Sequence, residues 1–149
     1  MKIGVKVLDA MTRNPVVVSP SISISECAII MGRDHVGSLI IKEGNLIVGI
    51  VTEQDIVRKI VAKGLNPDKT EVRTAMETNL FTITGKEDIY EALILMRDKN
   101  IRHLPVVQNG DLVGFLTIKD ILKIQPQLFE LIVEKFELRE EPNKPVSSK

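Results

Sequence analysis

The sequence has few cysteines and few aromatic residues. Of its 149 residues, one is cysteine (Cys27), none is tryptophan, and aromatic residues make up 3%. A single cysteine excludes an internal disulfide and a thiolate zinc cage. The scarcity of aromatics leaves Val, Ile, Leu and Met to fill a core, and the apolar fraction of 44% is enough to build one.

Net charge and long apolar runs are lacking as well. Twenty basic and twenty acidic residues cancel, which argues against nucleic acid or an anionic membrane surface as a partner. No segment approaches the roughly 20 apolar residues that a membrane span requires. The opening stretch "MKIGVKVLDAM" lacks the apolar core of a signal peptide, so we expect a cytoplasmic protein.

One seven-residue element occurs twice. The stretch "GIVTEQD" at 49–55 returns as "GFLTIKD" at 114–120, with Gly, Thr and Asp on the same spacing and a shift of 65. The same shift aligns Val7–Val57 with Val72–Leu122 without a gap, and matches Ala10-Met11 with Ala75-Met76. The chain is therefore a tandem duplication.

Each copy has the same predicted order of elements. The runs "VVVS" and "FTIT" predict strands, and apolar residues at helical spacing in "SISECAIIMGRD" and "KEDIYEALILMRDKN" predict helices. Apolar runs flank Asn109-Gly110, a strong hairpin signal, and Gly44-Asn45, a weaker one. A last helix is expected at Glu53–Lys63, stopped by Gly64, and at Ile118–Ile124.

The predicted unit is β-α-β-β-α, which places the chain in the mixed α/β (α+β) class. One such unit, near 60 residues, is too small to bury its sheet well alone. We therefore expect two units packed sheet to sheet about a pseudo-two-fold axis. The predicted divisions are a first copy at 7–64, a linker at 65–71, a second copy at 72–124, a C-terminal helix at 126–140 and a disordered tail at 141–149.

The Thr-x-x-Asp part of the repeated element has two interpretations. In a capping box, Thr accepts a hydrogen bond from the N3 amide and the acid at N3 returns one. As a ligand site, it lies where a strand passes into a helix, beside a glycine that permits close approach and a helix N-terminus that suits phosphate. Its carboxylate can also accept from two vicinal hydroxyls. The two roles are compatible, and both stay open here.

The duplicated unit resembles a tandem pair of cystathionine β-synthase (CBS) domains. The resemblance rests on "GIVTEQD" and "GFLTIKD" together with "AMTRNPVVVSP" and "IRHLPVV", and covers residues from about 7 to 124. It implies a Bateman module with two clefts between the halves, which bind adenosyl compounds such as AMP, ADP, ATP or S-adenosylmethionine. The implied ligand is regulatory, and no cofactor is obligatory.

The resemblance also implies which residues contact the ligand. The family's Asp holds the ribose hydroxyls and its Thr lies near ribose or phosphate, so Thr52 and Asp55 mark one site, and Thr117 and Asp120 the other. Adenine is implied to lie against the first strand and the opening of the second strand of the same copy. Those candidates are Val16, Val17, Val18, Val36, Gly37, Ser38 and Leu39, and in the second copy Thr82, Ile83, Ile101, Leu104 and Pro105.

The two copies differ in charge at these positions. The second has Arg102-His103 where the first has Gly37-Ser38, and Lys119 where the first has Gln54. These cations suit a phosphate chain, although exposed Lys and Arg also commonly form a solvated rim. Glu53 adds a negative charge to the first copy. We predict that nucleotides fill the second site first.

The remaining candidate residues have structural explanations. Cys27 aligns with Ala92, which favours a small buried core residue over a nucleophile. His35 aligns with Asn100 near a helix end, which favours a cap or a surface position. No metal-ligand pattern, catalytic triad or Walker loop is found. We predict no catalytic residue and no metal.

The segment "QLFELIVEKFELRE" lies outside the duplication. It predicts a helix at Gln127–Arg139 with an apolar stripe formed by Leu128, Phe129, Ile132, Val133 and Phe136. Such a stripe covers either an edge of the monomer or a second chain, and we favour a homodimer.

The sequence thus predicts a non-enzymatic, stand-alone CBS pair that binds an adenine nucleotide and passes a conformational change to a regulated partner. One alternative is a structural or interaction module without ligand, in which Thr-x-x-Asp serves only as a cap. The other is a regulatory subunit of an IMP dehydrogenase-like or other enzyme.

Overall fold

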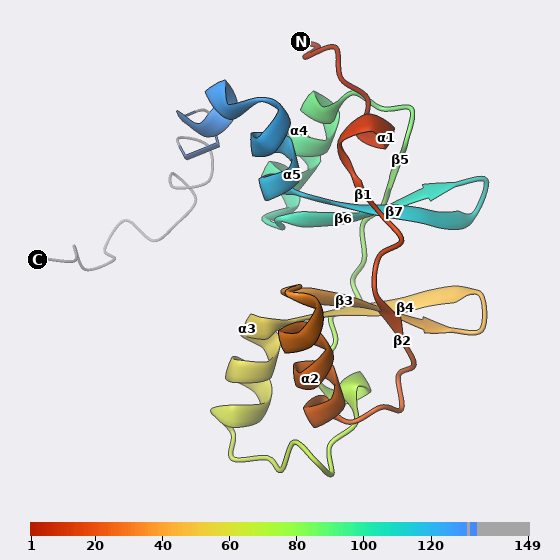
Figure 1. The fold of residues 1–149 in the computed structure, drawn as a ribbon, viewed down its shortest axis with the longest axis vertical. Helices are drawn as coiled ribbons and strands as arrows, with labels where there is room; N and C mark the ends of the chain where they lie inside the picture. Colours follow the sequence, from red (N-terminus) through yellow and green to blue (C-terminus); the bar gives the residue numbers. More distant parts are fainter. Residues whose placement is uncertain (131, 134–149) are drawn as a thin grey trace, which may run out of the picture. The chain divides into compact units, whose positions relative to one another are not determined.

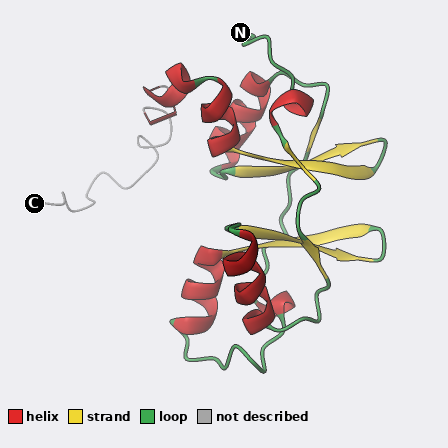
Figure 2. Cartoon of the chain, viewed as in Figure 1, coloured by secondary structure: helices red, strands yellow, loops and turns green. Residues whose placement is uncertain are grey.

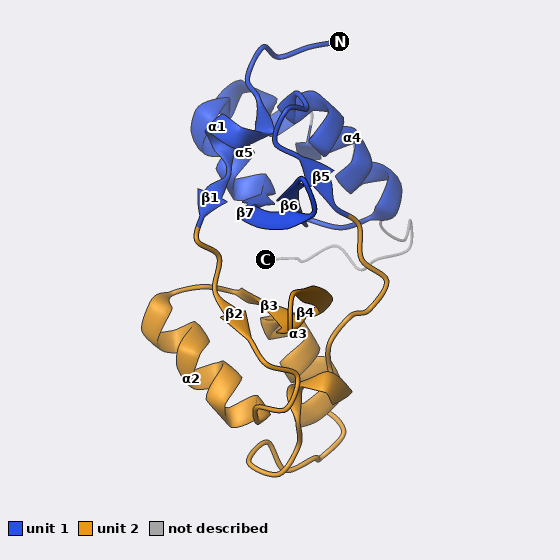
Figure 3. Ribbon diagram, turned by 90° about the vertical axis from the view of Figure 1, so that its right-hand side faces the viewer, with its two compact units in different colours: residues 1–13, 82–149 blue, residues 14–81 orange. Residues whose placement is uncertain are grey.

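The computed structural model describes residues 1–130, 132 and 133, and the chain forms two compact units. Unit 1 contains residues 1–13 and the chain from residue 82 onward, and unit 2 contains residues 14–81 (Figure 3). Within each unit, helices cover one face of a single sheet (Figures 1 and 2). The predicted mixed α/β class is confirmed. The packing of one sheet on the other stays a prediction.

Unit 2 has a three-stranded sheet in the order β2-β3-β4. Strand β2 pairs with β3 in parallel, and β3 pairs with β4 as an antiparallel hairpin. The elements of unit 2 are β2 (Val17–Val18), α2 (Ile24–Asp34), β3 (Ser38–Glu43), β4 (Leu46–Thr52), α3 (Glu53–Asp55), the π-helix η1 (Ile56–Val61) and the 3-10 turn η2 (Val72–Thr74).

Unit 1 repeats this plan with one further strand, and its sheet has the order β1-β7-β6-β5. Its elements are α1 (Val7–Ala10), β1 (Thr12–Arg13), β5 (Ile83–Thr84), α4 (Ile89–Lys99), β6 (His103–Gln108), β7 (Asp111–Thr117), α5 (Ile118–Ile124) and the 3-10 turn η3 (Pro126–Leu128). The order β5-α4-β6-β7-α5 is the predicted unit.

The predicted hairpins are confirmed. Asn109 and Gly110 join β6 to β7 with φ angles of 53° and 83°, so both adopt the left-handed conformation that short hairpin loops require. Gly44, in the loop between β3 and β4, has a φ of 62°. The loop positions therefore carry residues that tolerate positive φ.

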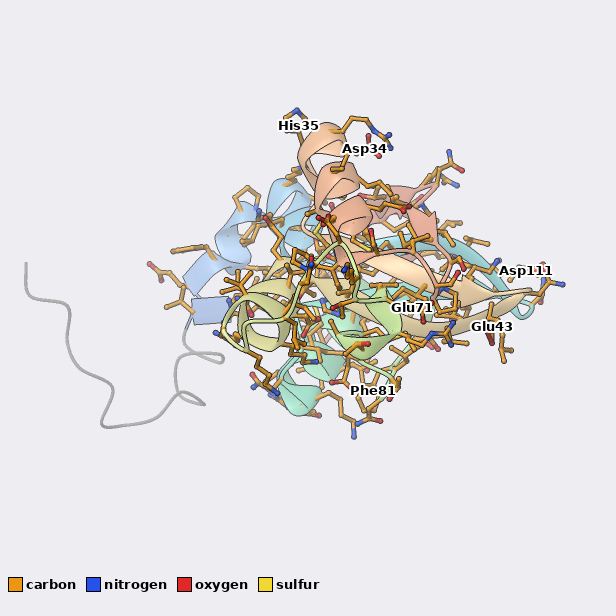
Figure 4. The ribbon with its side chains drawn as sticks, turned by 90° about the horizontal axis from the view of Figure 1, so that it is seen from below. Asp34, His35, Glu43, Glu71, Phe81 and Asp111 are labelled. Carbon is orange, nitrogen blue, oxygen red and sulfur yellow. The ribbon has the colours of Figure 1, made fainter. Side chains whose placement is uncertain are left out.

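The helix ends agree with the sequence signals. Helix α2 begins at Ser23, whose hydroxyl accepts from the Glu26 amide, and it ends at His35 with a φ of 55°. Asn100 ends α4 in the same way, with a φ of 54°. Asp34 and His35 project from the end of α2 (Figure 4), which confirms His35 as an exposed capping residue.

Cys27 lies in the hydrophobic core of unit 2. It is fully buried in a cluster with side chains from α2, β3, β4 and η1. Burial, together with the negative charge of Glu26, raises the pKa of its thiol to about 11. The thiol therefore stays protonated at neutral pH, and the prediction of a core residue is confirmed.

The two compact units do not coincide with the two sequence repeats, because each repeat contributes its opening segment to the other unit. The amide of Val7 donates to the Glu87 carbonyl at 2.8 Å, and 65 residues later the amide of Val72 donates to the Ile22 carbonyl at 2.8 Å. Thr12 pairs with Phe115 in unit 1, as Glu77 does with Ile50 in unit 2. The predicted division at 7–64 and 72–124 describes the sequence repeats, whereas residues 7–13 of the first repeat belong to unit 1 and residues 72–81 of the second repeat belong to unit 2.

The helix expected at Glu53–Lys63 is only partly α-helical. After α3, the chain widens into the π-helix η1, where the Ala62 amide donates to the Val57 carbonyl and the Leu65 amide to the Ile60 carbonyl. These bonds span five residues instead of four. Gly64 follows with a φ of 69°, which confirms the predicted stop.

The predicted C-terminal helix is described only at its start. After η3, residues 129–130 and 132–133 are helical. Leu128 and Ile132 are buried, whereas the Phe129 side chain is 58% exposed. The predicted apolar stripe is therefore only partly buried, because Leu128 and Ile132 lie in the core and Phe129 lies on the surface. Phe136 and the tail predicted at 141–149 lie outside the described residues.

Asp88, the N-cap of α4, anchors the N-terminal segment in unit 1. Its carboxylate accepts from the amides of Tyr90 at 2.9 Å, Ile3 at 3.0 Å and Gly4 at 2.8 Å. Burial raises the pKa of this carboxyl, but the three amide donors and the charge of Lys2 outweigh it and hold the pKa below its ordinary value. The stabilisation is therefore present above about pH 4 and lost as the pH falls through the lowered pKa.

We expect Asp88→Ala to lower the free energy of unfolding by about 0.5–2 kcal/mol at pH 7, because it removes a cap. The deficit should shrink at pH 3, where the wild-type carboxyl is increasingly protonated. Ser23→Ala is the matched control, since it removes the equivalent cap of α2 without a charge. Urea denaturation at both pH values measures the two deficits, and the same pH dependence for both variants would contradict the assignment to Asp88.

Candidate functional site

The repeated motif forms one strand-to-helix junction in each unit. In unit 2 the first junction consists of Gly37, Ser38, Thr52, Glu53 and Asp55. Pairing of Ser38 with Thr52, and a hydrogen bond from the Glu53 amide to the Gly37 carbonyl at 3.0 Å, bring these residues together. The backbone alone therefore gathers the residues predicted at this site.

In unit 1 the second junction consists of Arg102, His103, Thr117, Ile118 and Asp120, together with Lys119. His103 pairs with Thr117, and the Ile118 amide donates to the Arg102 carbonyl at 3.1 Å. The two junctions have the same backbone geometry and different side chains.

The first strand of each copy lies next to the junction of its own unit. Val17 pairs with Ile40, and the Ile40 amide donates to the Val16 carbonyl at 3.0 Å. In the second copy, Ile83 pairs with Val106. The first strand therefore pairs with the second strand within each unit, and the adenine contacts of these residues stay predictions.

Both Thr-x-x-Asp motifs form complete capping boxes. The Thr52 hydroxyl accepts from the Asp55 amide at 3.2 Å, and the Asp55 Oδ2 accepts from the Thr52 amide at 2.9 Å. Thr117 and Asp120 have the same two distances. The capping interpretation is confirmed, and a ligand role would be additional to it.

The carboxylates of the two boxes have different further partners. Asp55 Oδ2 also accepts from the Thr52 hydroxyl at 3.0 Å, and its Oδ1 forms an ion pair with Lys59 Nζ at 3.1 Å. Asp120 Oδ1 accepts from the Thr12 hydroxyl at 3.4 Å, a long contact. Among the described residues, Asp120 forms no ion pair.

Sequence reasoning missed Lys59 and Thr12. The spacing of Asp55 and Lys59, four residues apart on a helix, is a recognised pairing signal and could have identified Lys59. Thr12 comes from β1, more than 100 residues away from Asp120 in the chain, and no sequence pattern connects the two.

The predicted phosphate-binding residues lie together at the second junction. Arg102 and Lys119 are exposed, whereas His103 is half-buried and its ring stacks on Phe115 with centroids 5.6 Å apart. His103 thus has a packing role of its own. At the first junction, Glu53 Oε1 lies 2.7 Å from the point where a Gly37 side chain would begin. A carboxylate there occupies the space where Arg102 begins in the other copy.

Four of the predicted adenine contacts are buried: Leu39, Ile83, Leu104 and Pro105. Leu39 and Leu104 have no exposed surface, and Leu39 packs in the core cluster of unit 2. Side chains alternate between the faces of a strand, so these two point into the helix-covered side. Both are core positions, and their contact with adenine stays a prediction. Val36, Ser38 and Ile101 are partly exposed, and Gly37 is exposed.

The glycine of each motif permits close approach, but the approaching group is a methionine. A Cβ at Gly49 would lie 2.5 Å from Met76 Sδ, and one at Gly114 would lie 2.3 Å from Met11 Sδ. Each methionine belongs to the exchanged opening segment of the other repeat. Packing therefore explains both glycines without a ligand.

Within residues 1–130 and 132–133, no group of three or more His, Cys, Asp and Glu side chains could hold a metal ion. Over the same range, no helix has the length and apolar character needed to cross a membrane.

Comparison with known proteins agrees with the duplication. The sequence profile of the CBS domain matches the chain twice, at residues 7–62 and 71–126. The chain belongs to the CBS-domain family. The matched ranges agree with the predicted copies to within about two residues at each end.

Similar proteins come from archaea, bacteria and a plant. An uncharacterised protein of Methanopyrus kandleri is 37% identical over 89% of this chain and 68% of its own length. A CBS domain-containing protein of Bacillus subtilis is 32% identical over 77% of this chain and 81% of its own. A solved structure of an uncharacterised conserved protein from Pyrococcus horikoshii aligns with a TM-score of 0.75 at 28% identity. The alignment covers 97% of this chain and 100% of that one. CBS pairs are generally regulatory or ligand-sensing modules.

Proposed function

We propose that this CBS pair is a non-enzymatic cytoplasmic regulator that binds an adenine nucleotide at the second junction and transmits its occupancy to a partner protein. The observation that carries the proposal is that the second junction combines the Asp120 carboxylate with two exposed cations, Arg102 and Lys119. A carboxylate suits ribose hydroxyls, and fixed cations suit phosphates.

A panel of ligands in a thermal-shift assay tests the proposal. The panel contains AMP, ADP, ATP, S-adenosylmethionine and NAD. A ligand at 100 times its dissociation constant should stabilise the folded protein by about 2.7 kcal/mol. If no member stabilises the protein, the alternative of a structural or interaction module without ligand is favoured, because capping and methionine packing already account for the Gly, Thr and Asp that the two motifs share.

Charge distinguishes the two junctions as nucleotide sites. A charge-assisted contact to phosphate contributes about 1.5–3 kcal/mol. We expect AMP to bind first at the second junction and its affinity to fall with added salt, because Arg102 and Lys119 are exposed. The first junction carries the Glu53 carboxylate instead, which repels phosphate.

Arg102→Ala should weaken AMP binding about tenfold or more and leave adenosine binding nearly unchanged. Calorimetric titration of both ligands measures the difference. Arg97→Ala is the control, because Arg97 lies in the same unit and is paired with Asp98 at 2.9 Å, outside the junction. Equal losses for AMP and adenosine would mean that Arg102 supports the shape of the site and does not bind phosphate.

We also propose a homodimer that uses the surface around Phe129. This aromatic side chain is 58% exposed beside the buried Leu128 and Ile132, and exposed aromatics are enriched at interfaces. Phe129→Ser should shift the protein towards monomer in sedimentation without lowering its stability. Val57→Ser, at an equally exposed apolar position of unit 2, is the control. An unchanged sedimentation coefficient for Phe129→Ser would place the interface elsewhere.

A further inference from the structure

The Asp55 carboxylate has little capacity left for a ligand. A carboxylate offers about four acceptor positions on its two oxygens. Asp55 Oδ2 uses two of them for the amide and hydroxyl of Thr52, and Oδ1 uses one for Lys59 Nζ. One position remains, whereas a vicinal diol needs two.

The Asp120 carboxylate is less occupied. Its Oδ2 accepts from the Thr117 amide, and its Oδ1 accepts from the Thr12 hydroxyl at 3.4 Å. Two acceptor positions remain, and the long Thr12 contact can be given up because a hydroxyl rotates freely. The residue equivalent to Lys59 in this unit is Ile124, which has no donor.

Lys59 is fixed in place by a second contact. Its Nζ donates to the Ala75 carbonyl at 3.0 Å as well as to Asp55, and its side chain is 37% exposed. An isolated surface ion pair contributes little. Here the carbonyl, which belongs to the exchanged segment of the second repeat, holds the ammonium group over the carboxylate.

We propose that Lys59 is a specificity-determining residue that closes the first junction to the diol of a nucleoside, so that each chain binds one nucleoside ligand, at the second junction. This inference rests on the proposed function. The effect of Lys59 differs from that of Glu53, whose charge repels phosphate. Lys59 occupies an acceptor position that the ribose needs, and therefore excludes uncharged nucleosides as well as nucleotides.

Adenosine is the probe that isolates this effect, since it has the diol and no phosphate. Calorimetry of the full chain should give one adenosine per wild-type chain and two per Lys59→Met chain. Methionine keeps most of the apolar stem and removes the ammonium group. Lys63→Met, an exposed lysine two residues beyond η1, should stay at one. The double variant Asp55→Ala/Lys59→Met should return to one, which places the added adenosine at Asp55.

The reciprocal change tests the same inference at the second junction. Ile124 is 38% exposed and lies four residues after Asp120 on α5, so Ile124→Lys places an ammonium group within reach of that carboxylate. We expect adenosine affinity to fall at least tenfold, with Ile124→Met as the matched control. This variant also keeps the inference testable if Lys59→Met folds poorly.

The outcomes separate the inference from the function on which it rests. Two adenosines per wild-type chain, or one per folded Lys59→Met chain, overturns the role of Lys59 and leaves nucleotide binding intact. An unchanged affinity in Ile124→Lys also overturns it. If adenosine and AMP bind to none of the proteins, the proposed function and the inference fall together.

Discussion

Replacing Asp120 with alanine should weaken adenosine and AMP binding about 10- to 150-fold and leave the protein folded. A charged acceptor that binds the ribose hydroxyls contributes about 1.5–3 kcal/mol to the binding free energy, and this substitution removes it. The loss of folding stability should be smaller, because the Thr117 hydroxyl still accepts a hydrogen bond from the backbone amide of residue 120 at the start of α5. Two hydrogen bonds disappear: the return bond from the Thr117 amide to Asp120 Oδ2, and the long contact from the Thr12 hydroxyl to Oδ1.

Asp120→Asn separates the two roles of this residue. The asparagine oxygen can still accept from the Thr117 amide, so stability should return towards that of the wild type. Its uncharged amide offers fewer acceptor positions, and nucleotide binding should stay weak. Calorimetry and urea denaturation of both variants provide the two measurements. Unchanged affinity in Asp120→Ala alongside a lowered melting temperature would leave only the cap.

Local sequence signals predicted the elements that position the junctions. The Thr-x-x-Asp spacing predicted the capping boxes at Thr52 and Thr117, and both are present. Asn109-Gly110 predicted a hairpin whose φ angles are both positive. These signals are reliable because the interactions that they describe are contained within a few residues of chain.

The exchange of opening segments could not be predicted from the sequence. Met11 could pack on Gly49 of its own repeat or on Gly114 of the other, because the duplication gives both repeats the same glycine and the same methionine. The structure places Met11 on Gly114 and Met76 on Gly49. A residue pattern that both repeats share contains no information on which of the two pairings forms.

The unlike partners of the two Asp carboxylates were predictable only in part. Lys59 is visible in the sequence four residues after Asp55, whereas its second partner, the Ala75 carbonyl, depends on the exchanged segment. The widening of the helix at η1 also has no sequence signal that distinguishes Ile56–Val61 from the regular α5. Tertiary contacts of the exchanged segments therefore account for most of what sequence reasoning missed.

A side chain at Gly49 should destabilise the protein more than one at Gly114, although the two glycines occupy equivalent positions. A Cβ at Gly49 would lie 2.8 Å from Met76 Cγ and 3.0 Å from Met76 Cβ. The Met76 Cβ is fixed by the backbone, so the methionine cannot turn away from the new atom. At Gly114 the nearest atoms are Sδ, Cε and Cγ of Met11, which rotation about the side chain can move.

We therefore expect Gly49→Ala to lower the free energy of unfolding by about 1–3 kcal/mol, as overpacking in a well-filled core does, and Gly114→Ala to lower it less. Urea denaturation of the two variants compares them directly. In a Met76→Ala background, Gly49→Ala should cost less, because the two shortest contacts, with Sδ and Cγ, are gone and only the 3.0 Å contact with Cβ remains, and a double-mutant cycle measures that coupling. If Gly49→Ala costs the same with and without Met76, the methionine is not the reason for the glycine. Close approach of a ligand to the backbone would then be the alternative reason for a glycine at this position.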